Sequence, residues 1–295
     1  MTAMLPGSAA HGIALGRRGK SSHRRGLSAL VLTLTLICSF AYFAPASSLR
    51  GVSAQSKPLS GSFGFLLNSS VAQTSTDNGG TAILGVMKFD GAGNVTGSYN
   101  VQLGNQPGPA GTFTGTYSTN TDGTGSVTLA LDAGISFTFA MIITDGGQGL
   151  QFVATGCTDS CDLGGIVIGG AARSAYAGSL KGSYGFQFNN SPNPGQSLGV
   201  ASFDGAGKVA VSLTFVGAGM GPDNDPHQAP VFTGTSAGTY SLNPDGSGVI
   251  VLPAAFGGQG DQMYAFVVVD GGSGLLLIQM NRSGSGVSSG TARLQ

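Results

Sequence analysis

The chain is 295 residues long, 41% hydrophobic and only 9% charged, with 52 glycines. This hydrophobic share excludes an intrinsically disordered chain, which would combine low hydrophobicity with high net charge. Every acidic residue is aspartate, and residues 55–295 hold seven Lys or Arg against 13 Asp, a net charge of −6. We therefore expect no nucleic-acid partner, because a nucleic-acid-binding protein needs a basic face.

Residues 1–54 have the pattern of a secretory signal peptide. Five Lys or Arg precede an uncharged apolar run that extends from Leu27 to about Ala44, and small-residue sites end at Ala46 and Ala54. These are the three parts of an export signal. We expect cleavage after Ala54, with Ala46 as the alternative, and a secreted, periplasmic or cell-surface protein. An uncleaved membrane anchor is the competing interpretation, because the apolar run is about as long as the shortest membrane-spanning helices.

The remaining chain contains one sequence twice. The repeated blocks are 59–65 with 180–186, 89–95 with 203–209, 115–125 with 238–248, 145–150 with 270–275, and 170–173 with 290–293. The blocks keep their order at offsets of 114 to 125 residues. A period of this length indicates a duplicated domain rather than a solenoid of short repeats. We assign the copies to residues 59–177 and 178–295.

Each copy reads as a series of short strands. Apolar residues alternate with polar ones, as in Phe63, Phe65 and Leu67, and this period of two is typical of half-buried strands. Asp-Gly sequences separate the strands and favour tight hairpin turns. The strands expected in the first copy are 60–69, 81–90, 94–103, 111–119, 125–132, 135–144, 149–156 and 162–172.

This order of strands predicts an all-β protein with two tandem eight-stranded antiparallel barrels of meander topology, with a β-sandwich as the second choice. The opening Leu-x-Gly-x-[Phe/Tyr] and closing Gly-x-Ala-Arg blocks resemble those of calycin-type barrels, the avidin and lipocalin group. The chain also resembles the glycine-rich tandem β-repeat proteins that some bacteria export. It departs from the calycins in having no Trp, so no ligand-binding residue is carried over from them.

Rows of inward aromatic rings are candidates for lining a ligand cavity, since a closed eight-stranded barrel can hold one small ligand. The candidates are Phe63, Phe65, Phe137 and Phe139 in the first copy, and Tyr184, Phe186, Tyr264 and Phe266 in the second. The alternative interpretation is that these rings only fill the core.

Two further groups of residues have chemistry that the barrels alone do not explain. Asp223, Asp225 and His227 combine two carboxylates with an imidazole, which suits a divalent metal, although a solvated Pro-rich loop is the competing interpretation. Cys157 and Cys161 predict a small disulfide in an oxidising compartment. We expect no other cofactor.

The sequence predicts a non-enzymatic protein, because most Asp residues fall in turns and no nucleophile or phosphate-binding motif is present. An exported structural or interaction protein of the cell surface or matrix is the first interpretation. A protein that binds a small apolar ligand is the second, and an outer-membrane barrel is the third. The natural partner is unknown from the sequence, with a small apolar ligand or a cell-surface component as the candidates.

Overall fold

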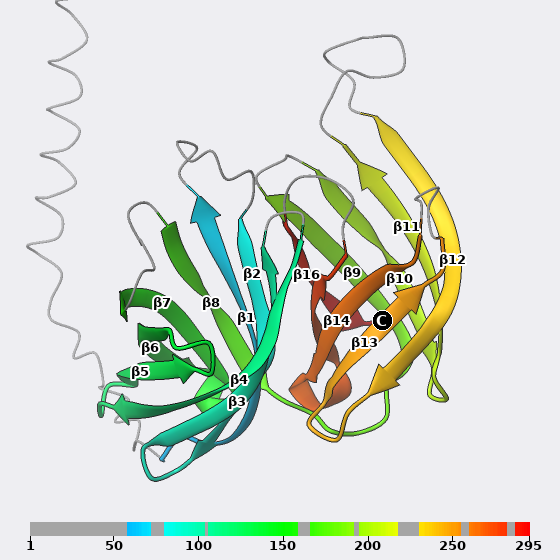
Figure 1. Ribbon diagram of the computed structural model, residues 1–295. Coiled ribbons are helices and arrows are strands. Elements are labelled where there is room, and N and C mark those ends of the chain that lie inside the picture. Colours follow the sequence, from blue (N-terminus) through cyan, green and yellow to red (C-terminus); the bar gives the residue numbers. More distant parts are fainter. Residues whose placement is uncertain are drawn as a thin grey trace, which may run out of the picture. The chain divides into compact units, whose positions relative to one another are not determined.

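A computed structural model of the chain describes residues 58–71, 80–103, 106–158, 166–191, 195–217, 230–254, 260–281 and 287–295 (Figure 1). The expected signal peptide lies outside the described residues, and so does the loop of Asp223, Asp225 and His227. Cys157 is described but Cys161 is not, so the disulfide stays a prediction.

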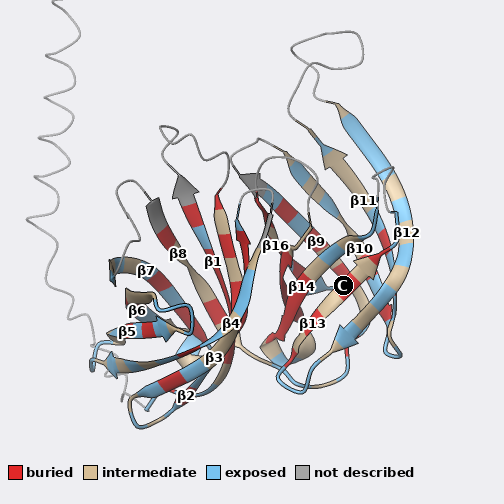
Figure 2. Cartoon of the chain, viewed as in Figure 1, coloured by how far each residue is buried: buried red, intermediate tan, exposed pale blue. Residues whose placement is uncertain are grey.

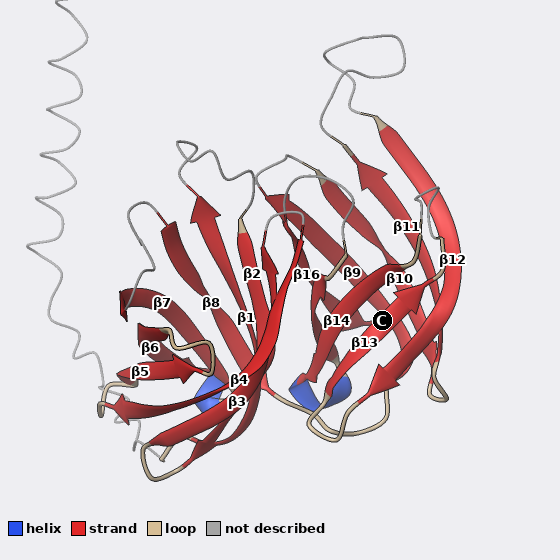
Figure 3. Cartoon of the chain, in the orientation of Figure 1, coloured by secondary structure: helices blue, strands red, loops and turns tan. Residues whose placement is uncertain are grey.

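The first copy forms a closed barrel of eight antiparallel strands (Figure 3). The strands are β1 (Ser60–Val71), β2 (Thr81–Asp90), β3 (Asn94–Leu103), β4 (Gln106–Thr119), β5 (Thr124–Leu131), β6 (Ser136–Thr144), β7 (Gly149–Thr158) and β8 (Ile166–Ser174). Each strand pairs with the next, and β8 pairs with β1 to close the ring. One short 3-10 turn, η1 (Asp145–Gly147), joins β6 to β7.

The second copy repeats this plan as a second closed barrel. Its strands are β9 (Lys181–Ser191), β10 (Gln196–Asp204), β11 (Lys208–Val216), β12 (Val231–Leu242), β13 (Ser247–Leu252), β14 (Gln262–Val269), β15 (Gly274–Gln279) and β16 (Val287–Leu294). The turn η3 (Asp270–Gly272) occupies the place of η1, and β16 pairs with β9 to close the ring.

The predicted fold class is confirmed, and the sandwich alternative is not formed. Ring closure pairs every strand on both sides, which removes the exposed edges that invite aggregation. The expected start of the fourth strand at residue 111 was wrong, because β4 begins at Gln106 and includes Pro107 and Pro109. Proline is tolerated there because the register between β3 and β4 shifts at Asn100 and Gln102, which relaxes the hydrogen-bond ladder.

The duplicated Asp-Gly-x-Gly blocks are hairpin turns at one end of each barrel, which we call the motif end. Asp90 Oδ1 accepts hydrogen bonds from the backbone N–H groups of Ala92 at 2.7 Å and Asn94 at 2.9 Å. Asp204 makes the same two bonds to Ala206 and Lys208, at 2.7 and 2.9 Å. The repeated aspartates are therefore accounted for by the turn that each one stabilises.

A leucine and a tyrosine close the motif end of each barrel. In the first barrel Leu59 is buried, and the Tyr117 hydroxyl donates a 2.6 Å hydrogen bond to its carbonyl oxygen. Phe89 packs edge-to-face against Tyr117, with ring centroids 4.9 Å apart. Leu180, Tyr240 and Phe203 repeat this arrangement in the second barrel, where the hydroxyl-to-carbonyl distance is 2.8 Å and the centroid distance is 5.1 Å.

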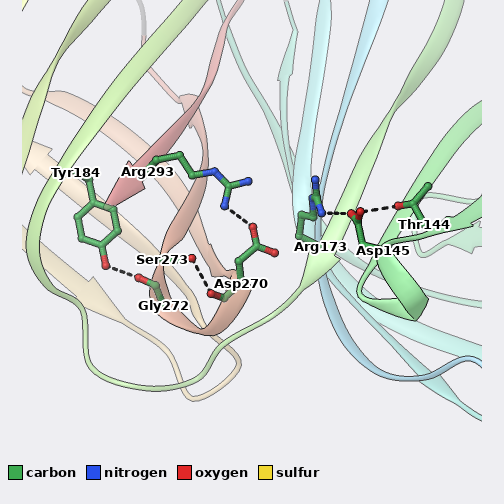
Figure 4. A network of polar contacts seen from close by, with 8 residues as sticks. All are labelled: Thr144, Asp145, Arg173, Tyr184, Asp270, Gly272, Ser273 and Arg293. Carbon is green, nitrogen blue, oxygen red and sulfur yellow. Dashed lines mark hydrogen bonds and ion pairs between the residues drawn. The ribbon is translucent and has the colours of Figure 1, made fainter. Parts of the chain in front are cut away.

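The last two repeated blocks meet at the same end (Figure 4). Arg173 on β8 forms an ion pair with Asp145 of η1, and Arg293 on β16 forms the equivalent pair with Asp270 of η3. Both aspartates adopt positive φ, 52° and 54°, a conformation that Asp tolerates better than most residues. Each pair joins the closing strand to the neighbouring turn. Every repeated block thus has a structural role at the motif end.

The two barrels also pack against each other through outward-facing apolar side chains. The first barrel contributes Leu66, Ala82, Leu84 and Val86 from β1 and β2, and the second contributes Ala265, Val267, Val269, Leu276, Ile278 and Val287 from β14, β15 and β16. These residues are buried. Figure 2 colours the buried residues of both barrels red. Gly64 on β1 permits the close approach, because a Cβ at that position would lie 2.6 Å from a Val267 methyl group.

The linker between the barrels is bonded to both. The Ala175 N–H donates to the Ser62 carbonyl of the first barrel at 2.8 Å, and the Tyr176 N–H donates to the Val268 carbonyl of the second at 2.9 Å. The side chains of Ser289 and Asn68 add a hydrogen bond of 2.8 Å between the barrels. Both barrels accordingly belong to one compact unit.

Tyr240→Phe tests the closure of the motif end. The substitution keeps the ring but removes the donor to the Leu180 carbonyl, so we expect the free energy of unfolding to fall by about 1 kcal/mol. Urea unfolding measures this value. Tyr176→Phe is the control, because Tyr176 is 37% exposed. Equal losses in the two variants would show that the Tyr240 hydroxyl does not stabilise the barrel.

Gly64→Ala tests the packing between the barrels. The added methyl group would lie 2.6 and 2.8 Å from methyl groups of Val267 and Val269, so we expect a loss of about 1–3 kcal/mol from overpacking. Gly185→Ala is the matched control at the same place in the second barrel. There the methyl group would meet only the side chain of Gln295, at 3.1 Å. Thermal melting should separate the two variants, and similar melting temperatures would contradict tight packing at Gly64.

Candidate functional site

The eight aromatic residues singled out in the sequence all lie in the two barrel cores. Six are buried, namely Phe63, Phe65, Phe139, Tyr184, Phe186 and Phe266. Phe137 and Tyr264 are partly buried and pack against the same cores. In the first barrel two of these rings, Phe137 and Phe139, lie next to each other with their centroids 6.1 Å apart.

A cavity of about 50 Å³ lies inside the second barrel. Of the eight candidate rings, Phe186 and Tyr264 line it, together with other apolar residues of the second core such as Phe188 and Ala201. Four of the lining side chains are polar: Ser197, Tyr264, Gln279 and Ser288. This cavity is the candidate site.

The cavity exists because the second barrel has smaller inward residues where the first has large ones. The strand registers match Ala201 to Met87, since each lies opposite the equivalent aromatic residue of the opening strand, Tyr184 or Phe63. Met87 is 1% exposed and fills the first barrel. Removing such volume from a packed core leaves a void unless neighbouring side chains move in.

Two inward-facing serines of the second barrel are also smaller than their counterparts in the first barrel. Ser197 lies opposite Phe188, whereas its counterpart Ile83 lies opposite Leu67. Ser288 takes the place of Ile168, each paired with the opening strand of its barrel. Each replacement of isoleucine by serine removes carbon atoms from the interior and adds a hydroxyl group.

Other replacements restore part of the lost volume. In the first barrel the ring of Phe113 lies over Gly97, where a Cβ would lie 2.3 Å from it. In the second barrel the corresponding pair is Ser236 and Val211, so Val211 in place of glycine restores part of the volume that Ser236 removes. Phe188 replaces the smaller Leu67 and contacts Tyr264, with ring centroids 5.5 Å apart. The remaining space is the cavity.

The polar lining residues gather near the end opposite the motif end, which we call the loop end. Ser197 is the second residue of β10, Gln279 is the last residue of β15, and Ser288 is the second residue of β16. Tyr264 and Gln262, near the start of β14, are joined by a 2.7 Å hydrogen bond from hydroxyl to amide oxygen. The cavity therefore has an apolar body and hydrogen-bonding groups towards the loop end, the usual composition of a small-molecule site.

The first barrel carries a different polar group at its loop end. The Tyr99 hydroxyl donates to Asp132 Oδ1 at 2.9 Å, and the Thr112 backbone N–H donates to Asp132 Oδ2 at 2.8 Å. The Thr112 and Tyr99 bonds hold the pKa of the Asp132 carboxyl below its usual value. Burial, and then the neighbouring carboxylate, raise the pKa of Tyr99. These contacts fix the β5–β6 hairpin to β3 and β4.

The polar half of the cavity was missed by the sequence analysis. Ser197, Gln279 and Ser288 lie outside the duplicated blocks, and serine at alternate strand positions is common throughout the chain. A residue-by-residue comparison of the copies would have found the two serines, because they correspond to Ile83 and Ile168 of the first copy.

The structure contains no cluster of three or more His, Cys or Asp side chains placed to hold a metal ion among the residues it describes. The proposed ligands Asp223, Asp225 and His227 lie outside those residues. Within the described ranges, no helix is both long enough and apolar enough to span a bilayer.

No family model matches this chain. No curated protein matches it at the significance level applied. Among solved structures, the chain is similar to the crystal structure of CghA with Sch210972, at 8% sequence identity and a TM-score of 0.27, over 80% of this chain and 88% of CghA. The crystal structure of CghA gives 8% identity and a TM-score of 0.26 over the same shares. Similarity this distant carries no inference about function.

Asp132→Asn tests the polar group of the first barrel. Because the folded-state pKa of Asp132 is depressed, its contribution to stability is present above the unfolded-state pKa, about 3.9, and is lost as the pH falls through the folded-state value. Urea unfolding at a series of pH values should show wild type more stable than the variant at pH 7, with the difference shrinking below about pH 4. A difference that does not change with pH would mean that ionised Asp132 does not stabilise the hairpin.

Proposed function

We propose that this chain is an exported, non-enzymatic protein whose second barrel binds a small, mainly apolar molecule. The observation that carries the proposal is the cavity bounded by Ala201, Ser197 and Ser288, at positions where the first barrel has Met87, Ile83 and Ile168. A duplicated barrel that only needed a filled core would gain stability from the larger residues, because voids cost free energy.

The size of the cavity limits the ligand. A cavity of about 150 Å³ in another protein holds benzene, and the space here is about 50 Å³. It therefore accepts a short alkyl group or a similarly small molecule without rearrangement. A ligand as large as an aromatic ring requires the half-buried side chains of Leu213, Tyr264 and Gln279 to turn aside. These are the lining side chains with room to do so, because they are only partly buried.

The polar residues give the ligand an orientation. A hydroxyl, carbonyl or amide group of the ligand would face Ser197, Gln279 and Ser288 at the loop end. The apolar part of the ligand would lie against Phe186 and the other apolar side chains that line the cavity. Among the described residues that line the cavity none is charged, so they would not compensate the burial of an ion there. The proposed ligand is accordingly uncharged.

A structural role at the cell surface or in a matrix is the second candidate, and the outer faces of the barrels favour it. Hydroxyl-bearing side chains pair across neighbouring outer strands, as in Ser118 with Ser126 at 3.0 Å and Thr128 with Thr138 at 3.3 Å. Such pairs stabilise antiparallel sheets without charge. The surface they make is polar but uncharged, which suits a protein that contacts neutral extracellular material.

Native mass spectrometry of protein purified without detergent from an exporting host tests the first proposal. We expect a mass excess that is lost on denaturation. Ala201→Met is the matched control, because it introduces the residue that already fills this position in the first barrel. The variant should lose the excess and keep its fold, as measured by circular dichroism.

The same preparations exposed to benzene or xenon give a second measurement. Wild type should melt at a higher temperature in their presence, and Ala201→Met should not respond. Wild type that carries no extra mass and responds to neither probe would leave the structural role as the better account.

A further inference from the structure

The barrels of one chain pack through unlike faces. The first barrel uses the outer face of β1 and β2, and the second uses the outer face of β14, β15 and β16. Each barrel therefore also possesses the face that its partner uses. The second barrel has an equivalent of the β1–β2 face on β9 and β10, and the first has an equivalent of the β14–β15 face on β6 and β7.

The equivalent face on β9 and β10 keeps apolar residues at two positions. Leu198 and Val200 correspond to Leu84 and Val86, because the register of β9 with β10 repeats that of β1 with β2. Leu84 is 1% exposed in the contact between the barrels, whereas Leu198 is 61% exposed. A large apolar side chain this exposed is uncommon on an isolated soluble protein when it lies in a patch.

The equivalent face on β6 and β7 keeps apolar residues as well. Ile142 corresponds to Val267 and Val153 to Ile278, since the pairing of β6 with β7 repeats that of β14 with β15. Val267 and Ile278 are 1% and 0% exposed, whereas Ile142 and Val153 are 53% and 45% exposed. The two faces unused within the chain thus carry exposed counterparts of the residues that are buried in the internal contact.

We propose that these two faces bind each other between chains. The β6–β7 face of one chain packs on the β9–β10 face of a second copy, in the manner in which β14 and β15 pack on β1 and β2 within the chain. A contact between unlike faces is head-to-tail. An open assembly of this kind therefore has an unused β6–β7 face at one end and an unused β9–β10 face at the other. This inference does not depend on the cavity of the second barrel.

Two retained features support the proposal. Gly185 occupies the place of Gly64, the glycine that permits close approach in the internal contact, and Asn189 occupies the place of Asn68, which accepts the hydrogen bond from Ser289. A shallow hollow of about 450 Å³ over β10, β11 and β12 borders this face at Val200.

The proposed contact between chains should be weaker than the contact between the barrels within one chain, because several residues differ. Gln187 replaces Leu66, Gln196 replaces Ala82 and Gln151 replaces Leu276, so less apolar area is buried. The side chain of Gln295 also lies against Gly185 and must shift. Each of these features lowers the affinity. The association is therefore expected to be reversible and concentration-dependent rather than permanent.

Sedimentation velocity of three proteins tests the proposal: wild type, Ile142→Lys and Leu198→Lys, purified without detergent from an exporting host. Wild type should show a mass that rises with concentration. Each variant alone should stay monomeric, because every head-to-tail contact then includes one charged face. An equimolar mixture of the variants should form dimers and nothing larger, since one intact pair of faces remains.

Thr116→Lys is the control, because it adds the same charge to an exposed position on β4 outside both faces and should associate as wild type does. Circular dichroism and thermal melting check that the variants are folded, which is expected because Ile142 and Leu198 are exposed. The proposal is overturned by a monomeric wild type at all concentrations, by a mixture that stays monomeric, or by self-association of Ile142→Lys alone, which would indicate contact between like faces.

Discussion

An eight-stranded barrel encloses a volume that its own inward side chains must fill, and this constraint decides most of what distinguishes the two halves of the chain. Both barrels have the same strand order and the same closing pair of strands. In the first, Met87, Phe113 and Phe139 belong to one buried hydrophobic cluster. In the second, Ala201 and two serines occupy inward positions, and the strands cannot move closer to compensate, because their hydrogen bonds fix the circumference. Volume removed from the side chains therefore stays as a cavity.

The two ends of each barrel differ in how much the copies have diverged. At the motif end the same contacts recur: the buried leucine with its tyrosine donor, the aspartate turns, and the ion pair of arginine with the 3-10 turn. At the loop end the first copy has the Tyr99–Asp132 pair, and the second has Gln279, Ser288 and Tyr264. A constant closed end and a variable opposite end are what a duplicated scaffold needs if its copies are to have different roles.

Alternation of apolar and polar residues was sufficient to predict the strands, and Asp-Gly pairs were sufficient to predict the turns, because both signals are local. The packing of one barrel on the other was not predictable in the same way. Leu275, Leu276, Leu277 and Ile278 form a run that is apolar on both faces of β15, so the run indicated burial without naming a partner. The cavity escaped prediction for a related reason: each inward serine is unremarkable alone, and only its comparison with Ile83 or Ile168 gives it meaning.

The hydrogen bonds from Ala175 to Ser62 and from Tyr176 to Val268 attach neighbouring residues of the linker to different barrels. Many two-domain proteins capture a molecule by hinge closure, with the domains swinging together around it. A linker that is hydrogen-bonded to both barrels, together with the apolar contact between them, opposes that motion. If the second barrel binds a small molecule, as proposed, that molecule must enter and leave through local opening of this barrel and not through movement of one barrel relative to the other.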